Sequence, residues 1–255
     1  MVVRSRSSRI LRTVAGWAVV ALFAFPLYYW LTVAFKDGNE IFNWPPKIFS
    51  FSPTVKNFEE VFGISLGFGF GEQREVLPGG GNWRMGPRLW DSIVIAVLST
   101  ALAVTIATLA SYALSRMHFR GRHHFVSWVL STRMMPPVAV AIPVFFIYKD
   151  LSLLDTYTGV ILIHALMNLP LVKGGLAAAG VLCFIFSWTE FLISLQLTTS
   201  IRTIPVKITT FVTSTGTEWG LITALGSAAL VPSFIFIMLV QKHLVRGLTL
   251  GSLKD

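Results

Sequence analysis

The chain has 255 residues, of which 54% are hydrophobic and 13% are charged, and its mean hydropathy is +0.68. A soluble domain carries about 25% charged residues, so the composition excludes an ordinary soluble protein and indicates a membrane protein. The formal net charge is +9. Because most of the excess basic residues lie beside apolar stretches, the charge indicates membrane topology and argues against a nucleic-acid partner.

Three long stretches contain no Asp, Glu, Lys or Arg: Thr13–Phe35, Ser92–Ser115 and Trp219–Gln241. A fourth, His123–Tyr148, contains only Arg133. A helix that crosses a bilayer needs about 20 mostly apolar residues, so each stretch is predicted to span the membrane. Together with the stretch that follows 156, they predict an all-α membrane protein of about six transmembrane helices, at about 12–35, 91–115, 124–148, 157–172, 175–197 and 219–241.

The apolar run 157–196 is about twice the length of one span and carries only Lys173 and Glu190. Pro170 disfavours a continuous helix, and the glycine pair that begins at Gly174 permits a turn. A single long helix would leave five spans and place the basic C-terminal tail outside the cell. The sequence therefore favours two spans joined by a short turn.

The short segments between these spans differ in charge. Counted over the two tails and the short segments, eleven lysines and arginines fall on one side and three on the other; the long segment 36–90 adds six to the second side, but acidic residues balance them and long loops count little. The positive side faces the cytoplasm, so both termini are predicted to be cytoplasmic and 36–90 to be an extracytoplasmic loop. That loop either contacts an external protein or is a simple connector. The whole chain, 1–255, is predicted to form a single transmembrane domain.

Motifs for chemistry are missing from the sequence. It contains no Walker-type phosphate loop, no Cys/His zinc spacing and no G-x-S-x-G motif. We therefore predict no catalytic residue, no metal site and no cofactor bound by this chain.

Polar residues within the predicted spans are the candidates for function, because an ionisable group in hydrocarbon is costly unless it faces protein or water. Prolines near Arg133 are expected to break or kink its helix, and broken helices at membrane depth usually line a cavity. The alternative is that Arg133 and Glu190 form a structural ion pair, or that one of them caps a broken helix. The candidates for a substrate path are Arg133, His164, Asn168, Trp188 and Glu190.

Several segments resemble one family when taken together. "DSIVIAVLSTALAVTIATLASYALSRMHFRGR" is similar to the second span and following loop of permease subunits of binding-protein-dependent ABC importers. "TRMMPPVAVAIPVFFIYKDLSLLDTYTGVILIHALMNLP" and "LAAAGVLCFIFSWTEFLISLQLT" resemble their third to fifth spans. "QKHLVRGLTLGSLKD" is similar to the C-terminal tail of the carbohydrate, MalG-like, branch. The resemblance covers nearly the whole chain outside 36–90.

The resemblance implies a type I ABC importer fold and an importer of several chains in the bacterial cytoplasmic (inner) membrane. The partners would be a second permease subunit, a dimer of ATP-binding subunits that carries ATP and Mg, an extracytoplasmic solute-binding protein and the lipid bilayer. This subunit would have no enzymatic activity and would form half of the path for a sugar, oligosaccharide or polyol. Its expected contacts with the ATPase are Arg246, Gly247, Leu248, Thr249, Gly251 and Lys254.

One part of the family pattern is absent. The resemblance implies a cytoplasmic loop with a Glu-Ala-Ala…Gly signature between the fourth and fifth spans, whose short helix docks on the ATPase. Here the residues between Pro170 and Lys173 leave room for a turn only. We therefore expect an uncoupled permease.

Three other functions stay open on the sequence. A stand-alone channel or secondary transporter would work without an ATPase, although no internal repeat or acidic ion-binding cluster favours it. An intramembrane enzyme would need a nucleophile–base or metal pair. A purely structural membrane partner would need neither.

Overall fold

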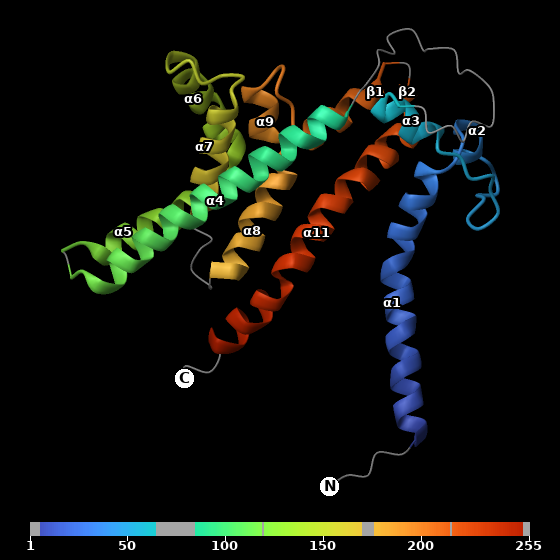
Figure 1. The fold of residues 1–255 in the computed structure, drawn as a ribbon, viewed down its shortest axis with the longest axis horizontal. Helices are drawn as coiled ribbons and strands as arrows, with labels where there is room; N and C mark the ends of the chain where they lie inside the picture. The colour runs from blue at the N-terminus through green and yellow to red at the C-terminus, as the bar shows by residue number, and fades with distance from the viewer. Residues whose placement is uncertain (1–5, 65–84, 119, 170–175, 215, 252–255) are drawn as a thin grey trace. The chain divides into compact units, whose positions relative to one another are not determined.

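The computed structural model describes residues 6–64, 85–118, 120–169, 176–214 and 216–251. Helices dominate these ranges (Figure 1), which confirms the predicted all-α class. Two very short strands, β1 and β2, pair with each other. In chain order the elements are α1 (Arg6–Ala34), α2 (Gly38–Ile41), α3 (Lys56–Phe62), α4 (Gly86–Arg116), α5 (Arg122–Ser131), η1 (Thr132–Met134), α6 (Pro137–Asp150), α7 (Tyr157–Asn168), α8 (Leu176–Thr189), α9 (Leu192–Leu197), α10 (Ile204–Ile208), η3 (Thr209–Phe211), β1 (Val212–Thr213), β2 (Gly216–Thr217) and α11 (Trp219–Gly251).

Three helical stretches among the described residues are long and apolar enough to cross a membrane: Ile10–Ala34, Gly86–Arg116 and Trp219–Gln241. Two further apolar helices, Tyr157–Asn168 and Ala178–Thr189, are shorter. The side chains from residue 10 to residue 28 of α1 are all exposed. An apolar surface of this kind is stable in lipid, where hydrocarbon surrounds it. The arrangement is that of a multi-pass membrane protein, and the count of six spans stays a prediction.

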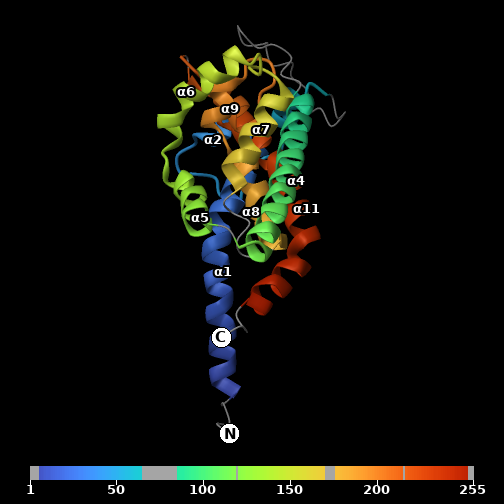
Figure 2. The same cartoon turned by 90° about the vertical axis from the view of Figure 1, so that its left-hand side faces the viewer.

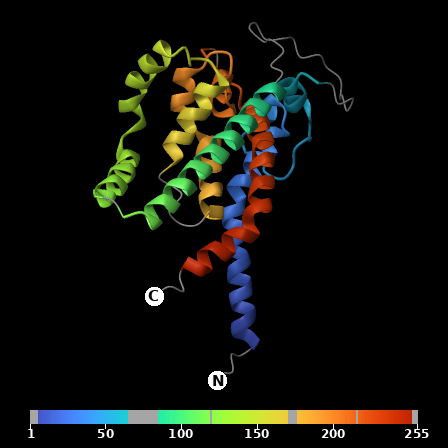
Figure 3. The same cartoon turned by 60° about the vertical axis from the view of Figure 1, so that its left-hand side comes forward.

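Two of the predicted spans are interrupted. The stretch 124–148 is divided into α5, a short 3-10 turn and α6, and Figure 3 shows α5 and α6 in yellow-green as separate helices joined by this turn. The break falls where Pro136 and Pro137 remove two backbone donors, and Pro137 begins α6 as a first-turn proline. Pro143 lies inside α6, which continues past it. The stretch 175–197 is likewise divided, into α8 and α9.

The described residues form two compact units. The first combines residues up to 84 with 213–227. In it, the Asn57 side chain donates hydrogen bonds to the carbonyl oxygens of Ala34 and Lys36, at 3.0 and 2.8 Å, and thereby caps the end of α1. Lys36 is 1% exposed, and its ammonium donates to the Lys47 carbonyl oxygen at 2.6 Å. The loop that follows α1 is therefore fixed by backbone groups.

The second unit, 85–212 with 228–255, has α4 as its central helix. α4 packs against both α7 and α8, as Figure 2 shows for α4 and α7. The buried residues Ile95, Ser99, Ala103 and Ala107 recur every four positions, so they lie on one face of α4. Three of these four are small, and small residues let helices approach closely in a membrane.

Candidate functional site

A connected set of polar side chains lies in the apolar interior of the second unit, and α4, α7, α8 and α9 each contribute to it. The ring of His164 lies between two serines: Nδ1 is 2.7 Å from Ser187 Oγ, and Nε2 is 3.0 Å from Ser194 Oγ. Ser187 Oγ is also 2.8 Å from Ser99 Oγ. His164 is 1% exposed, so these hydroxyl groups replace water around the ring.

Glu190 closes one end of this set and also explains why the fifth span is divided. Its carboxylate accepts hydrogen bonds from the backbone N–H groups of Ile193 (2.8 Å) and Ser194 (2.9 Å), which are free donors at the start of α9. It also accepts from Ser194 Oγ at 2.7 Å and lies 3.3 Å from His164 Nε2. The carboxylate thus acts as the cap of α9, which was one of the alternatives left open by the sequence.

The hydrogen bonds fix the proton positions at the Glu190 end of the set. Ser194 donates its only hydroxyl proton to Glu190, so Nε2 of His164 must donate to Ser194 Oγ. Nδ1 of the neutral ring then accepts from Ser187, which accepts from Ser99. Alternatively, Nδ1 donates to Ser187 Oγ and Ser187 donates to Ser99. Ser99 Oγ then donates to the Ala96 carbonyl oxygen at 3.2 Å, so every group again has a partner. The hydrogen bonds among Ser99, Ser187 and Nδ1 can therefore run in either direction.

Asn168 belongs to the same region, one helical turn after His164. Its side-chain amide donates to the carbonyl oxygen of His164 at 2.8 Å and to that of Cys183 at 3.4 Å. Cys183 Sγ in turn donates to the Asn168 carbonyl oxygen at 3.6 Å. These contacts join α7 to α8 next to the His164 set.

The other predicted path residues lie elsewhere. Trp188 is buried and stacks on Phe184 with ring centroids 5.6 Å apart, and Phe184 stacks on Phe236 of α11 at 3.9 Å. Trp188 therefore packs in an aromatic stack. The backbone of Arg133 lies in the 3-10 turn between α5 and α6.

The predicted ATPase contacts lie at the end of the chain. Lys254 lies outside the described residues, as does the predicted turn around Lys173. The remaining contacts are in the last turns of α11: Arg246, Gly247, Leu248, Thr249 and Gly251.

Sequence analysis missed the three serines of the set. A signal for two of them was present, because Ser187, Glu190 and Ser194 follow at intervals of three and four and so share a face of any helix. Ser99 carries no such signal, because a single serine is common in an apolar span. Within the described ranges no group of three His, Cys, Asp or Glu side chains is arranged to hold a metal ion.

A second polar cluster anchors the loop after α9. The Asp155 carboxylate accepts hydrogen bonds from the backbone N–H groups of Thr199, Ser200 and Ile201, at 2.9 to 3.1 Å. It also accepts from the hydroxyl groups of Thr199 and Ser200, at 2.8 and 2.6 Å. Nearby, Arg88 donates to the Ser200 carbonyl oxygen at 2.6 Å and pairs with Asp91 at 3.0 Å. The loop 198–203 is thereby fixed to the start of α4 and to the connection before α7.

The Asp155 cluster predicts a dependence of stability on pH. Burial raises the pKa of Asp155, but hydrogen bonds from Ser200, Thr199 and Ile201 outweigh it and hold the pKa well below its usual range. A lowered pKa stabilises the fold at neutral pH, and this contribution is lost as the pH falls below about 4.

We expect Asp155→Asn to destabilise the chain by about 1–2 kcal/mol at pH 7, a figure reduced for exposure, and the difference from the native chain to shrink in acid. Thermal unfolding in detergent measures this. Asp150→Asn is the control, because Asp150 is exposed; an equal loss in both variants contradicts the prediction.

Comparison with known proteins gives consistent results over almost the whole chain. The chain is 28% identical to the probable ABC transporter permease protein y4oR of Sinorhizobium fredii, over 98% of each chain. It is 27% identical to the sulfoquinovosyl glycerol transport system permease protein SmoH of Agrobacterium fabrum, over 97% of this chain and 95% of the relative. It is also 27% identical to the trehalose transport system permease protein SugB of Mycobacterium tuberculosis, over 94% of each. No family model matches the chain.

The alignments also differ from the chain in length. The alignment with the Sinorhizobium protein extends over 290 positions, whereas the chain has 255 residues. These numbers differ by 35. That relative therefore has at least 35 residues within the alignment that face a gap in this chain. The alignment with the Agrobacterium protein extends over 288 positions, so at least 33 positions of that relative, 288 less 255, likewise have no counterpart here.

Proposed function

We propose that this chain, which is a multi-pass membrane permease of the kind found in ABC transporters and is not an enzyme, forms half of the translocation path for a carbohydrate or a related solute. The observation that carries the proposal is the similarity over 94–98% of the chain to permeases, two of which are named for trehalose and for sulfoquinovosyl glycerol transport. The chain would lie in the bacterial inner membrane, as part of a system whose solute is a sugar, an oligosaccharide or a polyol.

The remaining parts of the importer follow from this role. A second permease subunit would complete the path, an extracytoplasmic binding protein would deliver the solute, and a dimer of ATP-binding subunits would hold ATP and Mg. The end of α11, from Arg246 to Gly251, would contact that dimer. Basic residues at this end support the assignment, since Lys242 and Arg246 mark it as the cytoplasmic end of the helix.

The His164 set is the proposed boundary of the path. Glu190 keeps 14% of its side chain exposed, while the residues behind it are buried. Glu190 is therefore the member of the set that keeps some exposed surface, and its carboxylate would accept from a solute hydroxyl group while the α9 amides hold it in place. Asn168 and His164, which lie behind Glu190, would hold α7, α8 and α9 together at this boundary. Arg133 stays in the proposal as a path residue on its sequence position alone.

We further propose that this chain is uncoupled from its ATPase. Support comes from the Sinorhizobium relative, which has at least 35 aligned positions that this chain lacks. The sequence between Pro170 and Lys173 is the place where we expect the missing segment. A helix that fills a groove on a partner needs several turns, and a turn of a few residues does not supply them.

The experiment compares two chains in one assay. The native chain and a variant that carries the corresponding segment of a relative between Pro170 and Lys173 are each reconstituted in liposomes with the second permease, ATPase and binding protein of the same organism. ATP-driven uptake of labelled di- and oligosaccharides is then measured. We expect the native chain to co-purify weakly with the ATPase and to give uptake at background, and the variant to restore both by at least tenfold.

The outcomes separate the two proposals. ATP-driven uptake by the native chain contradicts the uncoupled state and leaves the permease function standing. Uptake of sugar that needs no ATPase contradicts the importer and favours a channel. If the variant binds the ATPase but moves no carbohydrate, the proposed solute class is wrong.

A further inference from the structure

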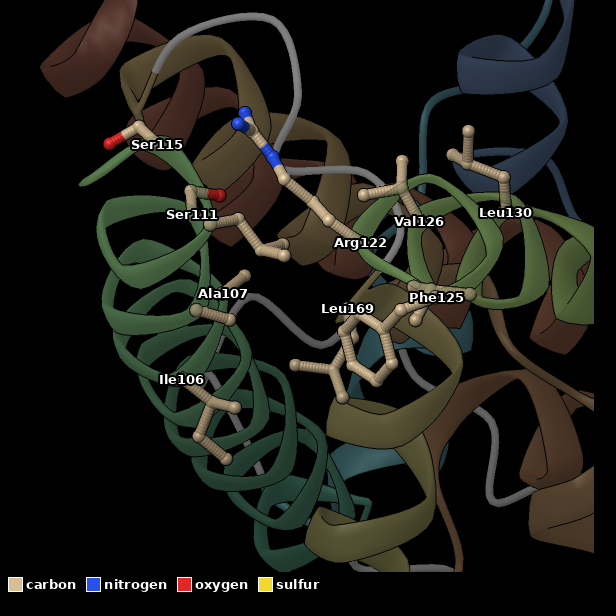
Figure 4. Close-up of a pocket in the computed structure, with 12 residues that line it drawn as sticks. Ile106, Ala107, Ser111, Ser115, Arg122, Phe125, Val126, Leu130 and Leu169 are labelled. Atoms are coloured by element: carbon tan, nitrogen blue, oxygen red, sulfur yellow. The ribbon is translucent and has the colours of Figure 1, made fainter. Parts of the chain in front are cut away.

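A cavity of about 440 Å³ lies in the second unit between the C-terminal half of α4 and α5 (Figure 4). This volume is in the range of sites that bind small molecules. Ile106 and Ala107 line it from α4, Phe125 and Leu130 from α5, and Leu169 from the end of α7. Its walls are almost entirely apolar, so the matching ligand has a hydrocarbon part.

The polar groups of the cavity are gathered at one end. Figure 4 shows Ser111 and Ser115 of α4 and the guanidinium of Arg122 at the same end, with Ile106 at the opposite end. Ser115 and Ile106 are nine residues apart on one helix, which corresponds to about 14 Å along its axis. The cavity is therefore amphipathic along its length, with one cationic end.

Arg122 is available to an anion. Within the part of the chain that the structure describes, no hydrogen bond or ion pair involves its guanidinium. It is the first residue of α5, so the positive end of that helix dipole adds to its charge. The sequence has no Asp or Glu between Ser92 and Lys149, and Arg116 and Arg120 lie close by in the chain. The surroundings are thus positive without an acidic residue nearby in the sequence.

We propose that this cavity binds one acyl chain of an anionic phospholipid, with the lipid phosphate beside Arg122. In the predicted orientation Arg116 and Arg122 lie at the cytoplasmic surface, where the bilayer carries its negative lipids and basic residues attract them. The apolar wall from Ser115 to Ile106 then runs from the headgroup level into the hydrocarbon. A packed protein helix matches the site less well, because it would need an acidic side chain to pair with Arg122.

The test measures bound lipid directly. The purified full chain is incubated in detergent with equal amounts of phosphatidylglycerol and phosphatidylcholine of the same acyl chains, and native mass spectrometry counts the adducts. We expect phosphatidylglycerol to be preferred by about fivefold, since one basic residue near the surface has an effect of that size. Arg122→Gln removes the preference, and Arg116→Gln, outside the cavity on the same side, keeps at least half of it. Ala110→Phe, which fills the cavity, reduces binding of both lipids.

Three results overturn the proposal. Equal binding of the two lipids means that the site does not select an anionic headgroup. The same loss of preference in both arginine variants means an unspecific basic surface. The third comes from a photo-reactive amino acid placed at Val126 in native membranes: a cross-link to phospholipid is expected, and a cross-link to a polypeptide means that a protein helix fills the cavity. Circular dichroism of each variant confirms that the helices have formed.

Discussion

Replacement of Gly159 by alanine is expected to be among the most damaging single substitutions in the chain. A Cβ atom at Gly159 would lie 2.2 Å from the carbonyl oxygen of Leu153 and 3.1 Å from Thr156 Oγ1. Neither atom is free to move: Thr156 Oγ1 donates to the Leu153 oxygen at 2.8 Å and accepts from the Gly159 N–H at 3.0 Å, which caps α7. Loss of this cap together with the steric overlap is expected to lower the free energy of unfolding by roughly 3–5 kcal/mol.

A matched control exists in the neighbouring helix. A Cβ atom added to Gly180 in α8 would have no atom within 4 Å, so Gly180→Ala is expected to be neutral or to stabilise by up to about 1 kcal/mol, because alanine favours the helix. The midpoint of thermal unfolding in detergent distinguishes the two, with a decrease of roughly 10 °C expected for Gly159→Ala. Equal midpoints for the two variants would show that the connection 153–159 adapts to a methyl group.

Removal of the His164 ring is expected to have the second large effect. His164→Ala leaves a void between α7, α8 and α9 and deprives the buried hydroxyl groups of Ser187 and Ser194 of a partner. The cavity and the two buried hydroxyl groups that each lose a partner together lower the free energy of unfolding by about 3–5 kcal/mol. The loss should appear as lower yield in the membrane fraction and a lower unfolding midpoint.

Two further variants test the cause. His124→Ala removes an exposed histidine and is expected to leave the midpoint unchanged. Combining His164→Leu with Ser187→Ala replaces polar groups by apolar ones, and this should recover part of the loss, because Ser194 Oγ still donates to Glu190 and Ser99 Oγ to the Ala96 carbonyl oxygen. If the double variant is as unstable as His164→Ala, the ring contributes through its shape and not through its hydrogen bonds.

The fold class was predictable from the sequence because charge-free runs as long as Ser92–Ser115 have few alternatives to a membrane helix. The break near Pro136 was predictable for a similar reason, since proline removes a backbone donor wherever it lies. The break after Thr189 was not predictable in the same way. It depends on Glu190 turning its carboxylate to the amides of Ile193 and Ser194, and a glutamate at that position is equally compatible with a continuous helix.

The candidate site was predicted in part. His164, Asn168 and Glu190 were singled out because polar residues are conspicuous in apolar spans, and the structure brings them together. Trp188 was included for its chemistry, but the direction of a side chain on a helix depends on the packing of its neighbours, and here Phe184 takes it into an aromatic stack. Hydrogen bonds across long intervals, such as Ser99 to Ser187, require the tertiary structure, because they join helices through residues that are 88 positions apart.

The burial of Cys183 has a practical consequence. It is the only cysteine in the sequence, it has no exposed surface, and its thiol group lies against the Asn168 carbonyl oxygen. A thiol reagent in water therefore cannot reach it while the chain is folded. Single cysteines introduced into the connecting segments can be labelled from either side of the membrane on this natural background, and the side from which each reacts reports directly how many times the chain crosses the bilayer.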